Sequence, residues 1–232
     1  MYHLTGVTKC YRSGGGVVRA LDGIGLCVED GGALVVQGAA GSGKSTLLRI
    51  LGGLERPTRG SVELDGTDLA TLTECRLARI RTESIGTVPS GGGLTPGFTA
   101  RQNVAGALLP LRLRPADRWE LAGEALREVG MDKQLDVAAE ELAAGARQRV
   151  ALARALVKRP TVLLADRPTA GLDAAARAEI AELFVRVWGE RRLTCVVATE
   201  DAALVGRAPR LATLSEGRVA AMARYPSAAA GG

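Results

Sequence analysis

The sequence contains few of the residues that build metal or redox sites. It has a single histidine, His3, and its four cysteines are too widely spaced to form a CxxC pair. A metal site built on histidine or cysteine is therefore not expected. The cysteine pattern is typical of a protein of the reducing cytosol.

Long hydrophobic runs are also missing. No stretch of about 20 consecutive apolar residues occurs, so no transmembrane helix is expected. The N-terminus lacks the apolar segment of a signal peptide. If the protein acts at a membrane, another chain is expected to supply the membrane-spanning part.

Aromatic residues make up only 3% of the chain, yet apolar residues together make up 47%, which is enough for a sizeable core. The length of 232 residues fits one large domain or one domain with an inserted lobe. The net charge of +5 permits contact with acidic partners or lipid head groups. It is too small to indicate a nucleic-acid-binding surface, so no nucleic acid is expected as a partner.

Hydrophobic patterning predicts strands that alternate with helices. Continuous apolar runs predict buried strands at 33–36, 161–166 and 193–198. Shorter strands are predicted at 2–8, 17–28, 61–64 and 85–88, with a final hairpin at 211–214 and 218–221. Helices are predicted at 45–54, 69–82, 174–188 and, with breaks, within 99–156. This alternation predicts an α/β fold with a mostly parallel sheet.

A glycine-rich loop between a predicted strand and a predicted helix is the strongest motif in the chain. Gly38 and Gly43 frame it, and Lys44 and Ser45 follow, which is the pattern of a phosphate-binding loop. Glycines let backbone N–H groups turn toward phosphate oxygens, and the helix N-terminus adds its dipole. Lys44 is expected to reach the β- and γ-phosphates of ATP, and Ser45 to ligate Mg²⁺. The alternative is an ordinary glycine turn before a helix.

The residues of this loop predicted to bind nucleotide are Gly38, Gly41, Ser42, Gly43, Lys44, Ser45 and Thr46. Asp166 is added because it closes the apolar run 161–165. In open α/β sheets, ligands lie beyond the carboxyl ends of the strands. Asp166 is therefore expected to hold Mg²⁺, directly or through water. The alternative is a strand-end aspartate that caps the next turn.

Longer stretches of the chain resemble one known family. Residues 51–58, 99–104 and 148–156 read as in the nucleotide-binding subunits of ATP-binding-cassette (ABC) transporters. The similarity is greatest to the branch that serves lipoprotein release, macrolide-type export and cell division. It extends from residue 2 to residue 222 and includes several motifs in the family's order.

This resemblance implies a P-loop NTPase fold of ABC type. Such a fold has a RecA-like, mostly parallel sheet core, an N-terminal antiparallel β subdomain and an inserted α-helical subdomain. A single domain is expected over 1–222. The core and β subdomain are expected at 1–88 and 157–222, and the helical subdomain with the signature motif at 89–156. Residues 223–232 are expected to form a disordered tail.

The resemblance also implies partners and a location. Such subunits pair so that two domains enclose two ATP molecules, and they bind an integral-membrane permease. The expected partners are therefore a permease and a second nucleotide-binding domain, identical or different. The expected location is cytoplasmic, peripheral on the inner face of the cell membrane. Tyr11 stands where the family has the aromatic residue that stacks on adenine, although a lone tyrosine is often a surface or packing residue.

Four positions depart from the family in the groups that act on the γ-phosphate. Arg167 replaces the glutamate that polarises the attacking water, and an arginine cannot accept a proton. Glu200 replaces a histidine that contacts the γ-phosphate. Ser90 replaces a glutamine, and Ala143 replaces the serine of the signature motif.

These departures favour an ATP-binding subunit, coupled to a permease, whose own hydrolysis is weak or absent. The alternative is an active ATPase that energises export or the transport of lipoproteins, peptides or drugs. A soluble ABC protein of DNA repair or translation is disfavoured, because the chain shows no long coiled coil, zinc cysteines or tandem cassette.

Overall fold

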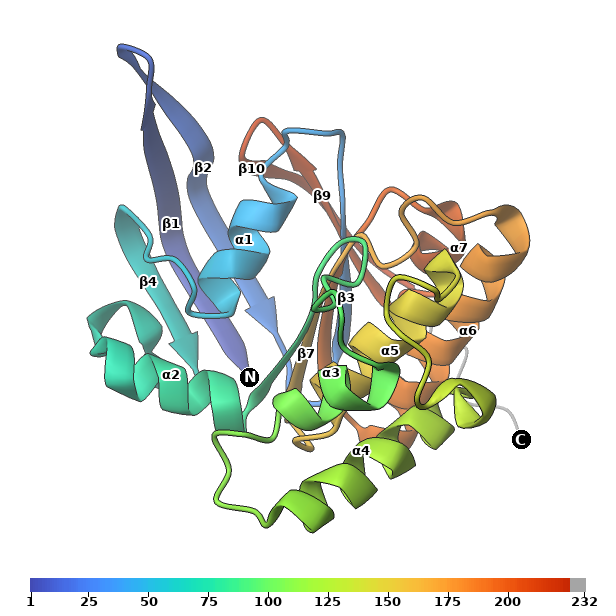
Figure 1. The fold of residues 1–232 in the computed structure, drawn as a ribbon. Coiled ribbons are helices and arrows are strands. Elements are labelled where there is room, and N and C mark those ends of the chain that lie inside the picture. Colours follow the sequence, from blue (N-terminus) through green and yellow to red (C-terminus); the bar gives the residue numbers. More distant parts are fainter. Residues whose placement is uncertain (226–232) are drawn as a thin grey trace.

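The computed structural model describes residues 1–225, which form two β-sheets with helices packed around them (Figure 1). The strands are β1 (Tyr2–Ser13), β2 (Gly16–Val28), β3 (Ala33–Gln37), β4 (Arg59–Leu64), β5 (Thr67–Asp68), β6 (Ile85–Val88), β7 (Val162–Asp166), β8 (Thr194–Ala198), β9 (Arg210–Ser215) and β10 (Arg218–Arg224). The α-helices are α1 (Lys44–Leu51), α2 (Glu74–Glu83), α3 (Ala100–Gly106), α4 (Pro115–Glu128), α5 (Ala144–Leu156), α6 (Ala174–Arg191) and α7 (Ala202–Val205). Two short 3-10 helices are η1 (Leu69–Thr71) and η2 (Asp132–Gln134).

The larger sheet is mostly parallel, with the strand order β10-β9-β3-β8-β7-β6. Only β10 is antiparallel to its neighbour, β9. The three buried strands predicted from apolar runs are confirmed, and they lie side by side as β3, β8 and β7. Val36 pairs with Ala198, and Ala198 pairs with Asp166. The carboxyl ends of these three strands therefore lie level at one edge of the sheet.

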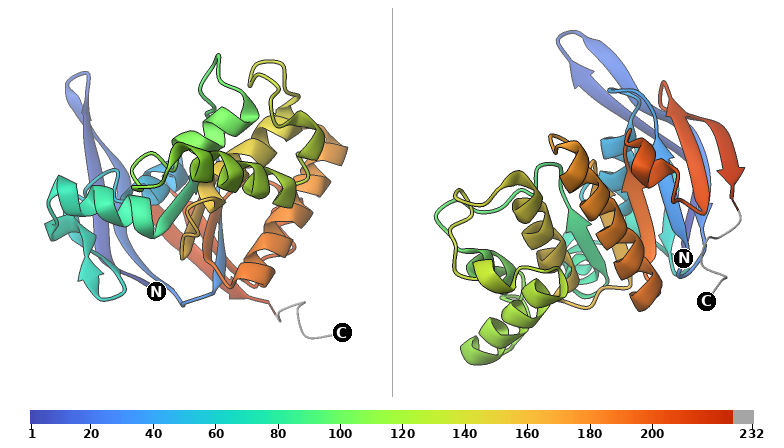
Figure 2. Two further views of the ribbon diagram at one scale, coloured as in Figure 1. Left: turned by 60° about the horizontal axis from the view of Figure 1, so that its bottom comes forward. Right: turned by 90° about the vertical axis from the view of Figure 1, so that its right-hand side faces the viewer.

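Side chains of β3 alternate between two hydrophobic cores. Leu34 and Val36 belong to a cluster that includes α1 and the smaller sheet, whereas Val35 belongs to a cluster with α5 and α6. Successive side chains of a strand point to opposite faces, so the large sheet is covered on both sides (Figure 2). Helix α1 fills the space between the two sheets, which fixes the start of this helix relative to β3.

The smaller sheet is antiparallel and has the order β2-β1-β4-β5. Strand β1 is longer than the predicted strand 2–8, because residues 9–13 continue the pairing with β2. In Figure 1 this hairpin projects beyond the body of the molecule. Its tip carries the exposed side chains of Val17 and Val18.

The single helix predicted at 69–82 is wrong. The structure has η1, a break at Leu72, and then α2. The hydroxyl of Thr73 accepts a hydrogen bond from the N–H of Arg76, and a side-chain cap of this kind starts a new helix. Among residues 1–225, no helix is long and apolar enough to cross a membrane.

The disordered tail predicted from residue 223 is corrected at its first residues. Strand β10 continues to Arg224, since Ala223 pairs with Leu211 and Arg224 with Arg210. The last part of the predicted tail, 226–232, lies outside the described residues.

Tyr2 links the first strand to the end of α1. Its buried hydroxyl donates a hydrogen bond to the carbonyl of Leu51 at 2.8 Å, and burial raises the pKa of Tyr2 above its usual range. We predict that Tyr2→Phe lowers the free energy of unfolding by about 1–3 kcal/mol, because the Leu51 carbonyl would stay buried without its partner. Urea denaturation measures this change, with the exposed Tyr225→Phe as the control. Equal stability of the two variants would contradict the prediction.

Candidate functional site

The phosphate loop connects β3 to α1, and two of its glycines are required by close backbone contacts. A Cβ atom at Gly38 would lie 2.2 Å from the carbonyl oxygen of Leu214. At Gly43, where φ is +101°, it would lie 2.4 Å from the carbonyl oxygen of Ala20. Any side chain at either position would push the loop away from its neighbours.

Gly217, in the turn between β9 and β10, supports the same loop from outside. Its N–H donates to the carbonyl of Ser42 at 3.1 Å, and its carbonyl accepts from the N–H of Asp22 at 2.8 Å. A Cβ atom at Gly217 would lie 2.8 Å from the carbonyl oxygen of Ala20. Sequence reasoning missed this residue, because only the tertiary fold shows that the turn lies against the loop.

Lys44 carries the positive charge of the loop, and its side chain is only 5% exposed. Its ammonium donates to the carbonyls of Gly38 at 2.5 Å and Ala39 at 2.8 Å, and it forms an ion pair with Glu200 at 3.0 Å. An ammonium has three N–H donors. These three contacts and a longer one to the Oγ of Ser42 at 3.4 Å therefore leave no N–H of the ammonium without a partner.

A cavity of about 220 Å³ opens beside the start of α1. The residues that line it are Ala20, Ala40, Gly41, Ser42, Gly43, Lys44, Ser45, Thr46, Arg167 and Glu200. The structure thus brings the predicted loop residues together with two of the four departing positions. Gly38, the first glycine of the loop, does not line the cavity, because it faces the backbone of Leu214.

Arg167 and Glu200 reach this cavity from neighbouring strands. Arg167 follows β7 in a left-handed conformation, with φ +44°, and its N–H donates to the carbonyl of Ala198 at 2.7 Å. Glu200 follows β8 directly after Thr199, whose N–H donates to the carbonyl of Val36 at 3.0 Å. Both side chains also line an adjoining cavity of about 250 Å³. Backbone contacts therefore fix both residues beside the phosphate loop.

Asp166, at the end of β7, has the chemistry of a magnesium ligand. Its Oδ1 is buried and accepts no hydrogen bond, and the Nε of Arg167, at 3.9 Å, is too distant for one. A buried carboxylate oxygen that accepts no hydrogen bond is costly. Mg²⁺ prefers oxygen ligands such as this carboxylate and the hydroxyl of Ser45, which lines the cavity. The two residues therefore fit the ion, which would neutralise phosphate charge when bound.

Tyr11 lies against α1, where a network of charged residues holds its hydroxyl. The hydroxyl donates to Glu55 and lies 3.4 Å from the Oγ1 of Thr46, while Arg49 donates to it at 3.3 Å. The ammonium of Lys9 lies 5.2 Å from the centre of the ring. Burial raises the pKa of Glu55, but the Tyr11 hydrogen bond and the nearby cations outweigh burial and hold it below its usual value. Tyr11 is thereby oriented beside the phosphate loop.

Ser90 is not among the residues that line the two cavities. It follows β6, the edge strand of the large sheet, and precedes Gly91, Gly92 and Gly93, all with positive φ. Arg154 of α5 donates to the carbonyls of Gly92 at 2.7 Å and Gly93 at 2.8 Å. Arg154 therefore ties the loop after β6 to α5.

Ala143 lies at the start of α5, also outside the two cavities. It is the N-cap residue, and its methyl group makes no hydrogen bond to the first turn. The serine that the family has here would supply a hydroxyl at a helix N-terminus.

Comparisons with known proteins agree with this geometry. The dimeric ATP-binding cassette MJ0796, solved in a post-hydrolysis state with ADP and Pi, superposes with a TM-score of 0.91 at 33% identity, over 98% of this chain and 100% of that one. The family described as ABC transporter matches residues 21–170. The chain belongs to the ABC transporter family. Its fold is the ABC cassette, with a P-loop, a mixed parallel sheet, an antiparallel N-terminal sheet and a helical region.

Relatives within the ABC transporter family indicate the branch to which the chain is most similar. The lipoprotein-releasing system ATP-binding protein LolD of Geobacter metallireducens is 43% identical, over 93% of this chain and 96% of its own length. The macrolide export ATP-binding/permease protein MacB of Rhodopirellula baltica is 40% identical, over 95% of this chain but only 32% of that longer protein. These similarities confirm the LolD- and MacB-like branch expected from the sequence.

A serine at position 143 tests the cap at the start of α5. We predict that Ala143→Ser raises the free energy of unfolding by about 0.5–2 kcal/mol, because the hydroxyl can accept a hydrogen bond from the first turn. Thermal and urea unfolding measure the gain. Ala144→Ser is the matched control, because Ala144 is the first residue of the helix itself and not the N-cap. An equal effect of both variants would contradict the capping explanation.

Proposed function

We propose that the chain is the Mg-ATP-binding subunit of an ABC transporter complex. The observation that carries the proposal is the phosphate cavity, which combines the loop after β3 with the buried ammonium of Lys44. Asp166, at the end of β7, does not line this cavity, but its buried Oδ1 accepts no hydrogen bond and is available to a cation. Ser45 and Asp166 are the proposed magnesium ligands. Tyr11 is the proposed adenine-stacking residue, supported by its position beside Thr46.

The proposed partners are an integral-membrane permease and a second nucleotide-binding domain. Relatives named for lipoprotein release and macrolide export support a permease of that kind. A dimeric cassette supports the second domain. The corresponding location is cytoplasmic, on the inner face of the cell membrane. We take 1–222 as one nucleotide-binding domain and 89–156 as its helical part.

We further propose that this chain's own site hydrolyses ATP weakly or not at all. Arg167 has no lone pair that could accept a proton from water. Glu200 brings a carboxylate beside the phosphate loop, where the family has a histidine. A general base typically contributes about 10²–10⁴ to a rate. Pairing with an intact partner would still set the partner's nucleotide against Ala143 and its neighbours.

The alternative, an active transporter ATPase, is favoured by the comparisons. The Geobacter relative carries the name of an ATP-binding protein of a releasing system. The MJ0796 cassette, at 33% identity, was solved after hydrolysis with ADP and Pi. Chemistry at the four altered positions opposes this alternative, whereas overall similarity supports it.

Phosphate release separates the two candidates. We predict that the purified chain releases phosphate from Mg-ATP within about tenfold of its Lys44→Ala variant, because the general base is replaced. A malachite-green assay measures the release, and binding of a fluorescent ATP analogue confirms that the wild type is loaded. Turnover far above that of Lys44→Ala would establish the active ATPase instead.

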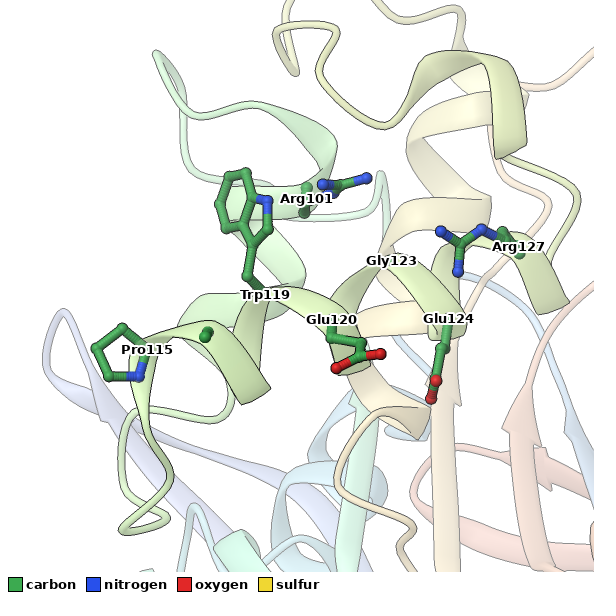
Figure 3. Close-up of a pocket in the computed structure, with 8 residues that line it drawn as sticks. Arg101, Pro115, Trp119, Glu120, Gly123, Glu124 and Arg127 are labelled. Atoms are coloured by element: carbon green, nitrogen blue, oxygen red, sulfur yellow. The ribbon is translucent and has the colours of Figure 1, made fainter.

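A groove between α3 and α4 supports the proposed permease contact. Its volume is about 520 Å³, and it is lined by Arg101, Pro115, Ala116, Trp119, Glu120, Gly123, Glu124 and Arg127 (Figure 3). The ring of Trp119 is 41% exposed, and the guanidinium of Arg101 lies 5.1 Å from its centre. Phe98 before α3 and Leu109 after it are also exposed. This helical region is where the family resemblance predicts that the permease docks.

Loss of the tryptophan tests this surface. We predict that Trp119→Ala lowers the amount of permease that co-purifies with the chain by about tenfold, since buried aromatic anchors dominate protein interfaces. Quantitative pull-down from detergent extracts measures the effect. Val18→Ala, which trims an exposed residue of the β1–β2 hairpin, is the control. Unchanged recovery with Trp119→Ala would place the permease elsewhere.

A further inference from the structure

Glu200 stands in the phosphate cavity where a ligand's anion would meet Lys44. Its Oε1 lies 3.0 Å from the Lys44 ammonium, which is otherwise surrounded by the carbonyls of Gly38 and Ala39. Lys44 is nearly buried, whereas the Glu200 side chain is 51% exposed. Without nucleotide, the ammonium therefore already has a counter-ion, and that counter-ion is free to move toward solvent.

The backbone holds Glu200 at this position from both sides. Thr199, before it, is hydrogen-bonded to Val36 of β3. Asp201, after it, donates its N–H to the hydroxyl of Thr199 at 3.0 Å and accepts from the N–H of Ala203 at 2.8 Å, which caps α7. Only the side chain of Glu200 can leave Lys44, because these contacts fix its main chain.

We propose, in an inference that rests on the proposed function, that Glu200 makes this site prefer a nucleoside diphosphate to a triphosphate. The backbone N–H groups of a phosphate loop can hold the first two phosphates without Glu200. Lys44 is expected to reach both the β- and the γ-phosphate, so a diphosphate shares Lys44 with the carboxylate through one phosphate, whereas a triphosphate does so through two. Two negative groups in a partly desolvated cavity repel each other more strongly than in water.

Because of Arg167, the triphosphate is expected to bind with reduced affinity and not to be excluded from the site. It lines both cavities that Glu200 lines. A carboxylate displaced from Lys44 therefore stays in a cavity that contains a guanidinium. The two opposite charges at positions 167 and 200 thus make the affinity depend on the number of phosphates, independent of any hydrolysis.

Isothermal titration calorimetry of the full chain with Mg-ADP and Mg-ATP tests the preference. The wild type is expected to bind Mg-ADP more tightly. Glu200→Gln is expected to tighten Mg-ATP binding by about tenfold, or 1.4 kcal/mol, and to change Mg-ADP binding by less than about threefold. Asp201→Asn is the matched control, because it removes a neighbouring negative charge that does not contact Lys44, and its amide oxygen can still accept from Ala203. This control is expected to keep the wild-type ratio of the two affinities.

Thermal unfolding supplies a second readout. Glu200→Gln without nucleotide should melt below the wild type, because buried Lys44 loses its counter-ion, and Mg-ATP should raise its Tm more than that of the wild type. An unchanged affinity ratio in Glu200→Gln, or an equal change in Asp201→Asn, would overturn the inference. If neither nucleotide binds the wild type or Glu200→Gln, the proposed function is itself wrong and the inference falls with it.

Discussion

The register of three buried parallel strands is the constraint on which the site depends. Val36 lies opposite Ala198, and Ala198 lies opposite Asp166, so the chain leaves β3, β8 and β7 at the same level. A slip of one residue would turn every side chain of a strand to the other face. Leu34 and Val35 belong to different hydrophobic cores, and both cores would be disrupted by such a slip. Packing far from the cavity thereby holds Glu200 within hydrogen-bond distance of Lys44.

The sequence predicts those parts of the site that are local. The phosphate loop has a fixed spacing, and Asp166 ends an apolar run, so both were found without tertiary information. Gly217 and the ion pair of Lys44 with Glu200 join segments that are distant in the sequence, and only the strand order brings them together. The presence of the strands and the α/β class are likewise predictable, because both follow from the pattern of apolar residues along the chain.

Boundaries were less predictable, and each error has a physical cause. Apolar spacing at 69–82 is compatible with one helix, but Thr73 offers its hydroxyl to the backbone and restarts the helix there. The end of β10 depends on whether β9 still offers a partner, and Arg210 does so for Arg224. Capping competes locally with the hydrophobic pattern, whereas strand pairing depends on a remote segment. Neither effect is visible in a window of apolar residues.

Under the proposed function, the groups that hold the nucleotide and the groups that would act on its γ-phosphate belong to different parts of this chain. The cradle is built from backbone, and Gly38 and Gly43 cannot change without collisions against neighbouring carbonyls. Arg167 and Glu200 project their half-exposed side chains from the ends of β7 and β8, where no core packing surrounds them. Substitution there alters the charge of the cavity but not its shape. Under the proposed function, the cradle persists while the charged groups beside it differ, and these charges then influence which phosphates it holds.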